Sequence, residues 1–93
     1  MLYIAYDISN DKTRTKLCKF LKKFGRHIQY SLFEITNSPR TLNKIMAEID
    51  MKYKKNFKIS DSVLIWNLTE TDERKIVRYG YAAQEEKDLI IFD

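Results

Sequence analysis

The sequence predicts an α+β fold of the ferredoxin-like type, in which two helices cover one face of an antiparallel sheet. Residues 2–6 and 62–68 form apolar runs rich in β-formers, which predicts two buried strands. Residues 12–24 and a segment that starts at Pro39 repeat apolar residues at helical spacing. The resulting order, β-α-β-(β)-α-β followed by extra strands, is that of a ferredoxin-like sandwich.

The length of 93 residues corresponds to one domain, with a core at 1–79 and a connector and terminal strand at 80–93. The single cysteine excludes an intrachain disulfide and favours a reducing compartment. No segment is apolar over the length of a membrane span. We therefore expect a cytoplasmic protein that does not contact a membrane.

The first helix is expected to follow the first strand after a short polar turn. Asn10 or Asp11 caps its start and Gly25 ends it. Four apolar residues at i, i+3, i+4 and i+7 form one stripe along it, which predicts the face that packs on the sheet. These residues are Leu17, Phe20, Leu21 and Phe24.

The next segment, residues 26–36, reads as extended, either as one long bent strand or as two strands with a kink near Ser31. Ser38 as N-cap and Pro39 at the first helical position start the second helix, which is expected to end near Met51. Beyond this helix we expect strands at 62–68, 74–79 and 88–93, the first two paired as a hairpin.

Strand 62–68 is apolar on both faces, with Val63 and Ile65 on one side and Leu64 and Trp66 on the other. Two helices cover only one face of the sheet, so we expect a second copy of the chain to cover the other. The apolar run 89–92 follows a polar connector, which is typical of a strand that pairs with the edge of another chain. The sequence thus predicts a homodimer.

Basic residues are unevenly distributed, although the net charge is only +4. Residues 12–26 include seven basic and no acidic side chains, and residues 52–58 include four lysines. Such segregation indicates a polyanion bound on one surface; the alternative is a solvated helix face. The candidate nucleic-acid-binding residues are Arg14, Lys16, Lys19, Lys22, Lys23 and Arg26.

Asp7, at the end of the first strand, is the candidate for metal chemistry. A carboxylate there is costly unless it is solvated, paired or bound to a cation such as Mg²⁺. The alternatives to a metal are that Asp7 caps the turn or pairs with Arg14. One aspartate per chain is few for cleavage of a phosphodiester bond, but a two-fold dimer would bring two copies together. The chain has no Walker loop, glycine-rich nucleotide motif or zinc-ligand spacing.

Several segments, in this order and spacing, resemble the CRISPR-associated protein 2 family, the small core subunit of CRISPR spacer acquisition. The resemblance extends over essentially the whole chain and is strongest from residue 1 to 36. Its segments are Tyr6-Asp7-Ile8-Ser9, Asp11-Lys12-Thr13-Arg14, Leu21-Lys22-Lys23-Phe24-Gly25, Ile28-Gln29-Tyr30-Ser31-Leu32-Phe33-Glu34 and the terminal apolar strand.

The resemblance implies a ferredoxin-like homodimer with exchanged C-terminal strands, in complex with the integrase CRISPR-associated protein 1. It also implies a metal-dependent nuclease on RNA or DNA, with Asp7 as the metal-binding and catalytic residue and Mg²⁺ as the expected ion. The family's basic positions fall on Arg14, Lys16 and Arg26. Lys16 replaces an arginine found in many members, which keeps the charge but loses bidentate phosphate geometry.

Three functional hypotheses follow. The first is a dimeric adaptor in spacer acquisition that bridges integrase subunits and holds duplex DNA by phosphate contacts. The second is a metal-dependent endonuclease that cuts RNA or DNA with Asp7 as metal ligand. The third is a toxin-like or regulatory domain that acts through proteins, which the basic run at 12–26 disfavours. The resemblance favours an enzyme, whose activity the cellular role need not require.

Overall fold

Strand β1 (Leu2–Asp7) lies inside a four-stranded antiparallel sheet of order β2-β3-β1-β4. It pairs with β3 (Leu32–Ile35) on one side and with β4 (Ser62–Asn67) on the other. Strand β2 (Gly25–Gln29) pairs with β3 at one edge of the sheet. The computed structural model describes residues 1–80, and in them the predicted α+β fold is confirmed.

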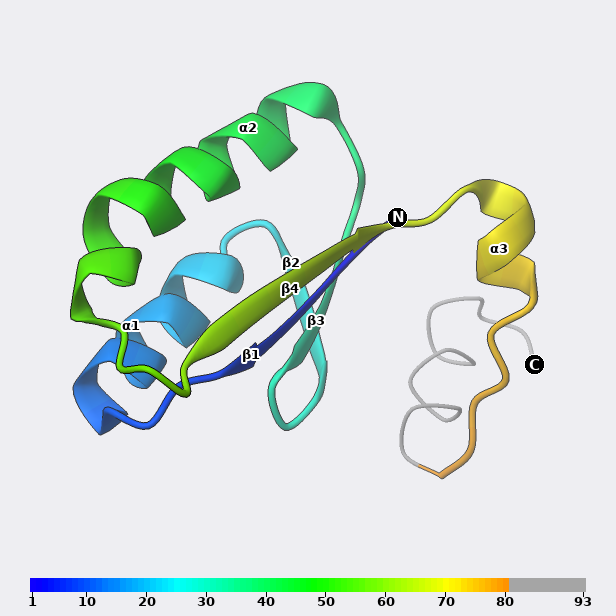
Figure 1. Ribbon diagram of the computed structural model, residues 1–93. Helices are drawn as coiled ribbons and strands as arrows, with labels where there is room; N and C mark the ends of the chain where they lie inside the picture. The colour runs from blue at the N-terminus through cyan, green and yellow to red at the C-terminus, as the bar shows by residue number, and fades with distance from the viewer. Residues whose placement is uncertain (81–93) are drawn as a thin grey trace.

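Helices α1 (Asp11–Leu21) and α2 (Pro39–Glu48) lie together on one side of the sheet (Figure 1). Alternate residues of β1 face them, so Leu2, Ile4 and Tyr6 are buried in the same core as residues from both helices. The other residues that complete this core are Ile8, Leu17, Phe20, Leu21, Phe33, Ile35, Ile45 and Ile49. Three of the four residues of the predicted stripe are therefore buried, and Phe24 packs against the core while partly exposed.

The extended segment 26–36 is two strands, which decides between the two alternatives left by the sequence. β2 and β3 form a hairpin around Tyr30 and Ser31, with a register shift between His27 and Gln29. The backbone amide of Tyr6 donates to the carbonyl of Ser31 at 3.1 Å, so the tip of the hairpin is held by the central strand.

The prediction that Gly25 ends the first helix is wrong, because Gly25 is the first residue of β2. Helix α1 ends at Leu21, where the amide of Lys22 donates to the carbonyl of Cys18 at 3.0 Å. A Cβ atom at residue 25 would lie closest to the carbonyl oxygen of Glu34 and 2.6 Å from Cγ1 of Ile35. Glycine is therefore required by the close approach of β2 to β3, not by a helix end.

The second helix begins as predicted, with the Ser38 side chain accepting from the amide of Thr41 at 3.0 Å and Pro39 in the first turn. It does not end near Met51. The chain continues through a π-helical turn, η1 (Ile49–Tyr53), and a 3₁₀ turn, η2 (Lys54–Asn56). This extension carries the second lysine cluster alongside α1.

The predicted strand at 74–79 is wrong. Residues Glu70–Arg74 form a short helix, α3, and no strand follows it within the described part of the chain. The Thr69 side chain accepts from the amide of Asp72 at 3.1 Å, and three acidic residues in the first turn suit the positive end of a helix. The predicted connector and strand at 80–93, apart from Gly80, lie outside the described residues. Within residues 1–80, no helix has the length and apolar character needed to cross a membrane.

The sheet face opposite α1 and α2 remains partly open in the described chain. On β4, Val63 and Ile65 pack against the core, as predicted for one face. On the other face Leu64 is 55% exposed and Trp66 is 45% exposed. Residues 1–80 therefore bury one face of β4, and they leave the other face, which was also predicted to be covered, partly exposed.

We predict that Gly25→Ala lowers the free energy of unfolding by about 1–3 kcal/mol, because the new methyl group overlaps the backbone of β3. Urea denaturation followed by circular dichroism measures this change. Gln29→Ala, at the exposed end of the same strand, is the matched control and should change stability by less than about 0.5 kcal/mol. Equal stability of Gly25→Ala and the unmodified protein would contradict the close β2–β3 approach.

Candidate nucleic-acid interface

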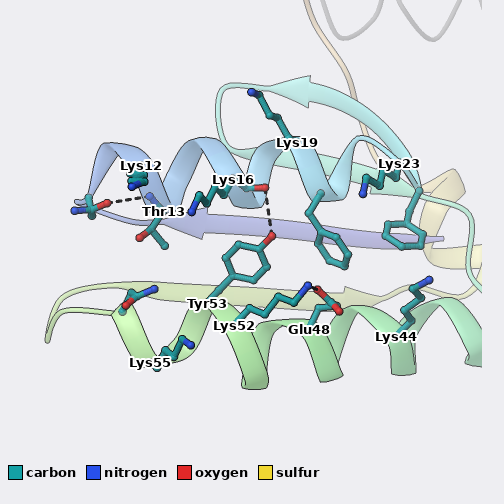
Figure 2. Close-up of a pocket in the computed structure, with 14 residues that line it drawn as sticks. Lys12, Thr13, Lys16, Lys19, Lys23, Lys44, Glu48, Lys52, Tyr53 and Lys55 are labelled. Carbon is teal, nitrogen blue, oxygen red and sulfur yellow. Dashed lines mark hydrogen bonds and ion pairs between the residues drawn. The ribbon is translucent and has the colours of Figure 1, made fainter.

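A groove of about 980 Å³ lies between α1 and the segment from α2 to η2. Figure 2 shows its two sides, with Lys12 and Lys55 at one end and Lys23 and Lys44 at the other. The α1 side carries four lysines, Lys12, Lys16, Lys19 and Lys23. The opposite side adds Lys44, Lys52 and Lys55.

Three lysines of α1 and Lys23, in the turn that follows the helix, are spaced at i, i+4, i+7 and i+11, so they form one row along the helix and its C-terminal turn. This row lies beside the apolar stripe that packs on the sheet. The two patterns explain why one helix can be buried on one side and strongly basic on another. Three of the six predicted binding residues, Lys16, Lys19 and Lys23, belong to this row.

Aromatic side chains join the two sides of the groove. The ring of Phe20 lies 5.1 Å from that of Phe24 and 5.9 Å from that of Tyr53, measured between centroids. The Tyr53 hydroxyl donates to the carbonyl of Lys16 at 3.4 Å. Burial, and then the negative charge of Glu48, raise the pKa of Tyr53.

Positive charge in the groove is largely uncompensated. Among the described residues that line it, Glu48 is the only acid, and its carboxylate pairs with the ammonium of Lys52 at 3.1 Å. The ammonium of Lys44 lies 6.0 Å from the ring centroid of Phe24. A row of like charges along a groove with aromatic walls concentrates a positive potential there, which attracts anions.

The other predicted basic residues lie elsewhere. Lys22 is exposed at the end of α1 and does not line the groove. Arg14 forms an ion pair with Asp11 and donates to the carbonyl of Ile8 at 2.8 Å, so it holds the loop between β1 and α1. Arg26 lies on β2 and binds Glu34 on the open face of the sheet.

Glu34 is a buried carboxylate with three hydrogen-bonding neighbours. The guanidinium groups of Arg26 and Arg78 each approach it to 2.7 Å, and the Tyr3 hydroxyl donates to it at 2.5 Å. Burial alone would raise the pKa of Glu34, but the hydrogen bonds from Tyr3, Arg78 and Arg26 outweigh it and lower this pKa. Burial and the hydrogen bond to Glu34 raise the pKa of Tyr3 to about 12. This network fixes Arg26 on the open face, away from the lysine groove.

Asp7 lies at the exposed end of β1, opposite Ser62 of β4. Its side chain alternates with Tyr6, so it shares the open sheet face with Tyr3 and Ala5. The sequence left two alternatives to a metal ligand, that Asp7 caps the turn or that it pairs with Arg14, and other residues take both roles in this structure. Asn10 caps α1 by accepting from the amide of Thr13 at 2.9 Å, and Arg14 pairs with Asp11.

The donor set around Asp7 fits a hard cation only in part. An exposed carboxylate suits Mg²⁺, which keeps several waters and uses one or two protein carboxylates. Residues 1–80 contain no group of three or more His, Cys, Asp or Glu side chains that would hold a metal ion. A metal held by Asp7 therefore needs further oxygen ligands from a second copy, from substrate phosphate or from water.

Asp61 braces the loop that follows Asp7. One carboxylate oxygen accepts from the amide and hydroxyl of Ser9 at 2.9 and 3.1 Å, and the other accepts from the amide of Lys58 at 2.8 Å. The amide of Lys58, the amide of Ser9 and the Ser9 hydroxyl together lower the pKa of Asp61. The loop between β1 and α1 is thus held by Asp61 from one side and by Arg14 from within.

The candidate residues predicted from the sequence do not include Asp61, Arg78 or four of the groove lysines, which are Lys12, Lys44, Lys52 and Lys55. For Lys44 a signal was available, because residues 44, 48, 52 and 55 lie at i, i+4, i+8 and i+11 and place one polar row on a continuous helical segment. For Arg78, and for the contact of Asp61 with Ser9, no local pattern exists, since the partners are distant in the sequence.

The comparison that decides the family covers most of the chain. The family model described as CRISPR associated protein Cas2 matches residues 1–76. The chain belongs to the Cas2 family. One relative, named CRISPR-associated endoribonuclease Cas2 2, from Methanospirillum hungatei, is 32% identical over 90 residues, which is 97% of each chain.

Two solved structures share the fold of this Cas2-family chain. Streptococcus pyogenes Cas2 aligns with a TM-score of 0.69 at 19% identity, covering 85% of this chain and 98% of that one. The hypothetical protein TT1823 of Thermus thermophilus aligns with a TM-score of 0.64 at 30% identity, covering 73% and 80% of the two chains. The first likeness shows the fold alone.

We predict that Asp61→Ala loosens the loop between β1 and α1, with the amides of Ser9 and Lys58 losing several-fold of their protection from hydrogen exchange. In the unmodified protein the pKa of Asp61 is lower in the folded than in the unfolded state. The stabilisation that the Asp61 carboxylate gives the loop is therefore present above the pKa of about 4 that an aspartate has in the unfolded state. This stabilisation is lost as pH falls through the lower pKa of Asp61 in the folded state.

The measurement is amide exchange by NMR, expressed as protection factors between about pH 3 and 6, a range chosen around the unfolded aspartate pKa. Asp50→Ala removes another exposed acid and is the control. Protection at Ser9 and Lys58 that is equal in both variants at every pH would show that Asp61 does not hold this loop.

Proposed function

We propose that this Cas2-family chain is a dimeric nucleic-acid-binding subunit of CRISPR spacer acquisition, which bridges copies of the integrase CRISPR-associated protein 1 while it holds duplex DNA. One observation carries the proposal: lysines gather on the helical side, and the opposite sheet face exposes apolar side chains. The first surface suits a polyanion and the second suits a second copy of the chain.

Duplex binding by the basic surface would use phosphate contacts. Lysine ammonium groups are point charges that neutralise phosphates without reading base sequence. Lys16, Lys19, Lys22 and Lys23 are free to serve in this way, because none of their ammonium groups has an ion pair with a described residue. Arg14 and Arg26 would contribute their charge while holding the loop and the open sheet face.

Dimerisation through the open sheet face would cover Leu64 and Trp66, the exposed apolar residues of β4. Among the strands of residues 1–80, β4 is also at an edge of the sheet, where a strand from a partner could pair with its backbone. We propose that residues 88–93 of the partner supply that strand, and that two copies of Asp7 approach each other across the two-fold axis. This arrangement would bury more area between the two copies than contacts between side chains alone.

The second candidate is a divalent-metal-dependent endonuclease. The exposed position of Asp7 supports it, as does the name endoribonuclease carried by the Methanospirillum hungatei relative. Two copies of Asp7 would hold Mg²⁺, which supplies charge stabilisation at a phosphodiester and an activated water. The chain's own contribution is to place the carboxylate on a strand end whose loop is fixed by Asp61 and Arg14.

We predict that duplex DNA binding falls steeply with salt, with a log–log slope of about −0.9 per phosphate contact. Reversing the charge of Lys16, Lys19 and Lys23 together should flatten the slope by about 3 × 0.9. The matched control reverses Lys54, Lys58 and Lys75, which are exposed and outside the groove, and produces the same net charge. Fluorescence anisotropy over a salt series measures both. A slope near zero in the unmodified protein, or the same flattening in the control, would remove the basis of the proposal.

We predict that Asp7→Ala abolishes any Mg²⁺-dependent nuclease activity but retains the dimer, duplex binding and spacer acquisition, because the adaptor role requires shape and charge and not a carboxylate. Cleavage in vitro and acquisition in cells are measured on the same variant. Leu64→Lys, on the same sheet face, is the control and should break the dimer and lose acquisition. If Asp7→Ala loses acquisition while its dimer and DNA affinity survive, the endonuclease is the function and the adaptor proposal is wrong.

A further inference from the structure

The lysine groove is narrow, and its width is set by one side chain. The Tyr53 hydroxyl, from the α2 side, reaches the backbone carbonyl of Lys16 on α1 at 3.4 Å. The ring of the same tyrosine lies against Phe20, 5.9 Å between centroids. At this point the two helical segments are therefore no farther apart than the reach of a tyrosine. A DNA duplex, whose major groove alone accommodates an α-helix, is too wide to enter between the two segments, and only a narrower chain can lie along the mouth of the groove outside Tyr53.

The lysines run along both walls of the groove. The row on the α1 side runs eleven steps, from Lys12 to Lys23 just past the helix end, which corresponds to about 16 Å at a helical rise of 1.5 Å per residue. The opposite wall carries Lys44 and Lys55 at its two ends, facing Lys23 and Lys12 (Figure 2). A phosphate backbone advances about 3.4 Å per nucleotide in a stacked strand, so up to about five phosphates fit beside this row. Both walls would neutralise the same strand.

Aromatic side chains lie between the two lysine rows. Phe24 and Tyr53 are partly exposed, in contrast to the buried Phe20 beside them. A basic groove that follows a backbone, combined with aromatic rings beside it, is the arrangement by which proteins bind single strands independently of sequence. A duplex presents its bases stacked inside, so these rings would offer it nothing.

From this geometry we propose that the groove between α1 and α2 is a binding site for one unpaired phosphodiester strand, which shares the α1 lysines with the duplex-holding surface and adds the α2 wall to them. The proposal deepens the proposed function and rests on it in one respect, that nucleic acid is the ligand of the basic surface. Duplex DNA contacts the lysines of the α1 side, including Lys22, from outside the groove. The single strand lies along the mouth of the groove, outside the Tyr53 side chain, where Lys44 and Lys55 of the opposite wall also reach it. The α2 wall therefore matters for the single strand and not for the duplex.

The test uses Lys44→Glu/Lys55→Glu, two substitutions on the α2 side that leave every residue proposed for duplex contact in place. The control Lys54→Glu/Lys58→Glu has the same net charge and lies outside the groove. Lys44→Gln/Lys55→Gln repeats the test with a smaller perturbation, and circular dichroism verifies that each variant folds. Affinities are measured by anisotropy for oligo-dT and oligo-U of about eight nucleotides, within the usual site size for single strands, and for a mixed-sequence DNA duplex.

We expect the groove variant to bind the single strands at least about tenfold more weakly than the control does, with duplex affinity equal in the two variants. Comparison of oligo-dT with oligo-U shows whether DNA or RNA is preferred. Equal loss of single-strand and duplex binding would overturn the inference and leave the proposed function intact. Single-strand loss no greater than in the control would also overturn it. If the unmodified protein binds the single strands but no duplex, the inference stands and duplex holding fails; if it binds neither, both fail.

Discussion

Strand β1 pairs on both sides and alternates between two environments, and the rest of the structure depends on this constraint. Leu2, Ile4 and Tyr6 enter the core under the helices, while Tyr3, Ala5 and Asp7 face the opposite side. Because a one-residue shift in register would exchange the two sets, the buried triplet fixes where Asp7 emerges. At the hairpin tip the carbonyl of Ser31 accepts from the amide of Tyr6 in β1. At the start of the chain the amino group of Met1 donates to the carbonyl of Leu68, just after β4.

The layer order separates two kinds of chemistry. The helical side is dominated by ammonium groups in a groove with aromatic walls, and the sheet side combines apolar residues of β4 with a buried carboxylate network. Glu34, paired with two arginines and Tyr3, illustrates the difference. A buried charge is tolerated only when it is fully hydrogen-bonded, whereas the exposed lysines remain solvated and available for an anion.

Arginine and lysine have different tasks in this chain. Arg14, Arg26 and Arg78 donate to carboxylates or carbonyls of the protein itself, and their planar, multiple donors suit such fixed contacts. The lysines of the groove, Lys52 apart, have no ion pair with the part of the chain that the structure describes. Charge counted from sequence therefore overstates the role of the arginines at a ligand surface and understates that of Lys44.

The sequence by itself determined the α+β class, the two helix starts, the buried stripe of α1 and the family. Each follows from local periodicity, caps or residue order. Tertiary structure alone decided that Gly25 is needed by its neighbour strand and that Arg26 and Arg78 meet at Glu34. The helix at 70–74, with its Thr69 cap, and the Arg14–Asp11 pair at i, i+3 have local signals that the sequence interpretation did not use. Tertiary structure also brought Lys44 and Lys55 opposite α1. The reason is physical: caps and stripes act within a few residues, whereas close approach, ion-pair choice and the meeting of two charged rows depend on segments far apart in the chain.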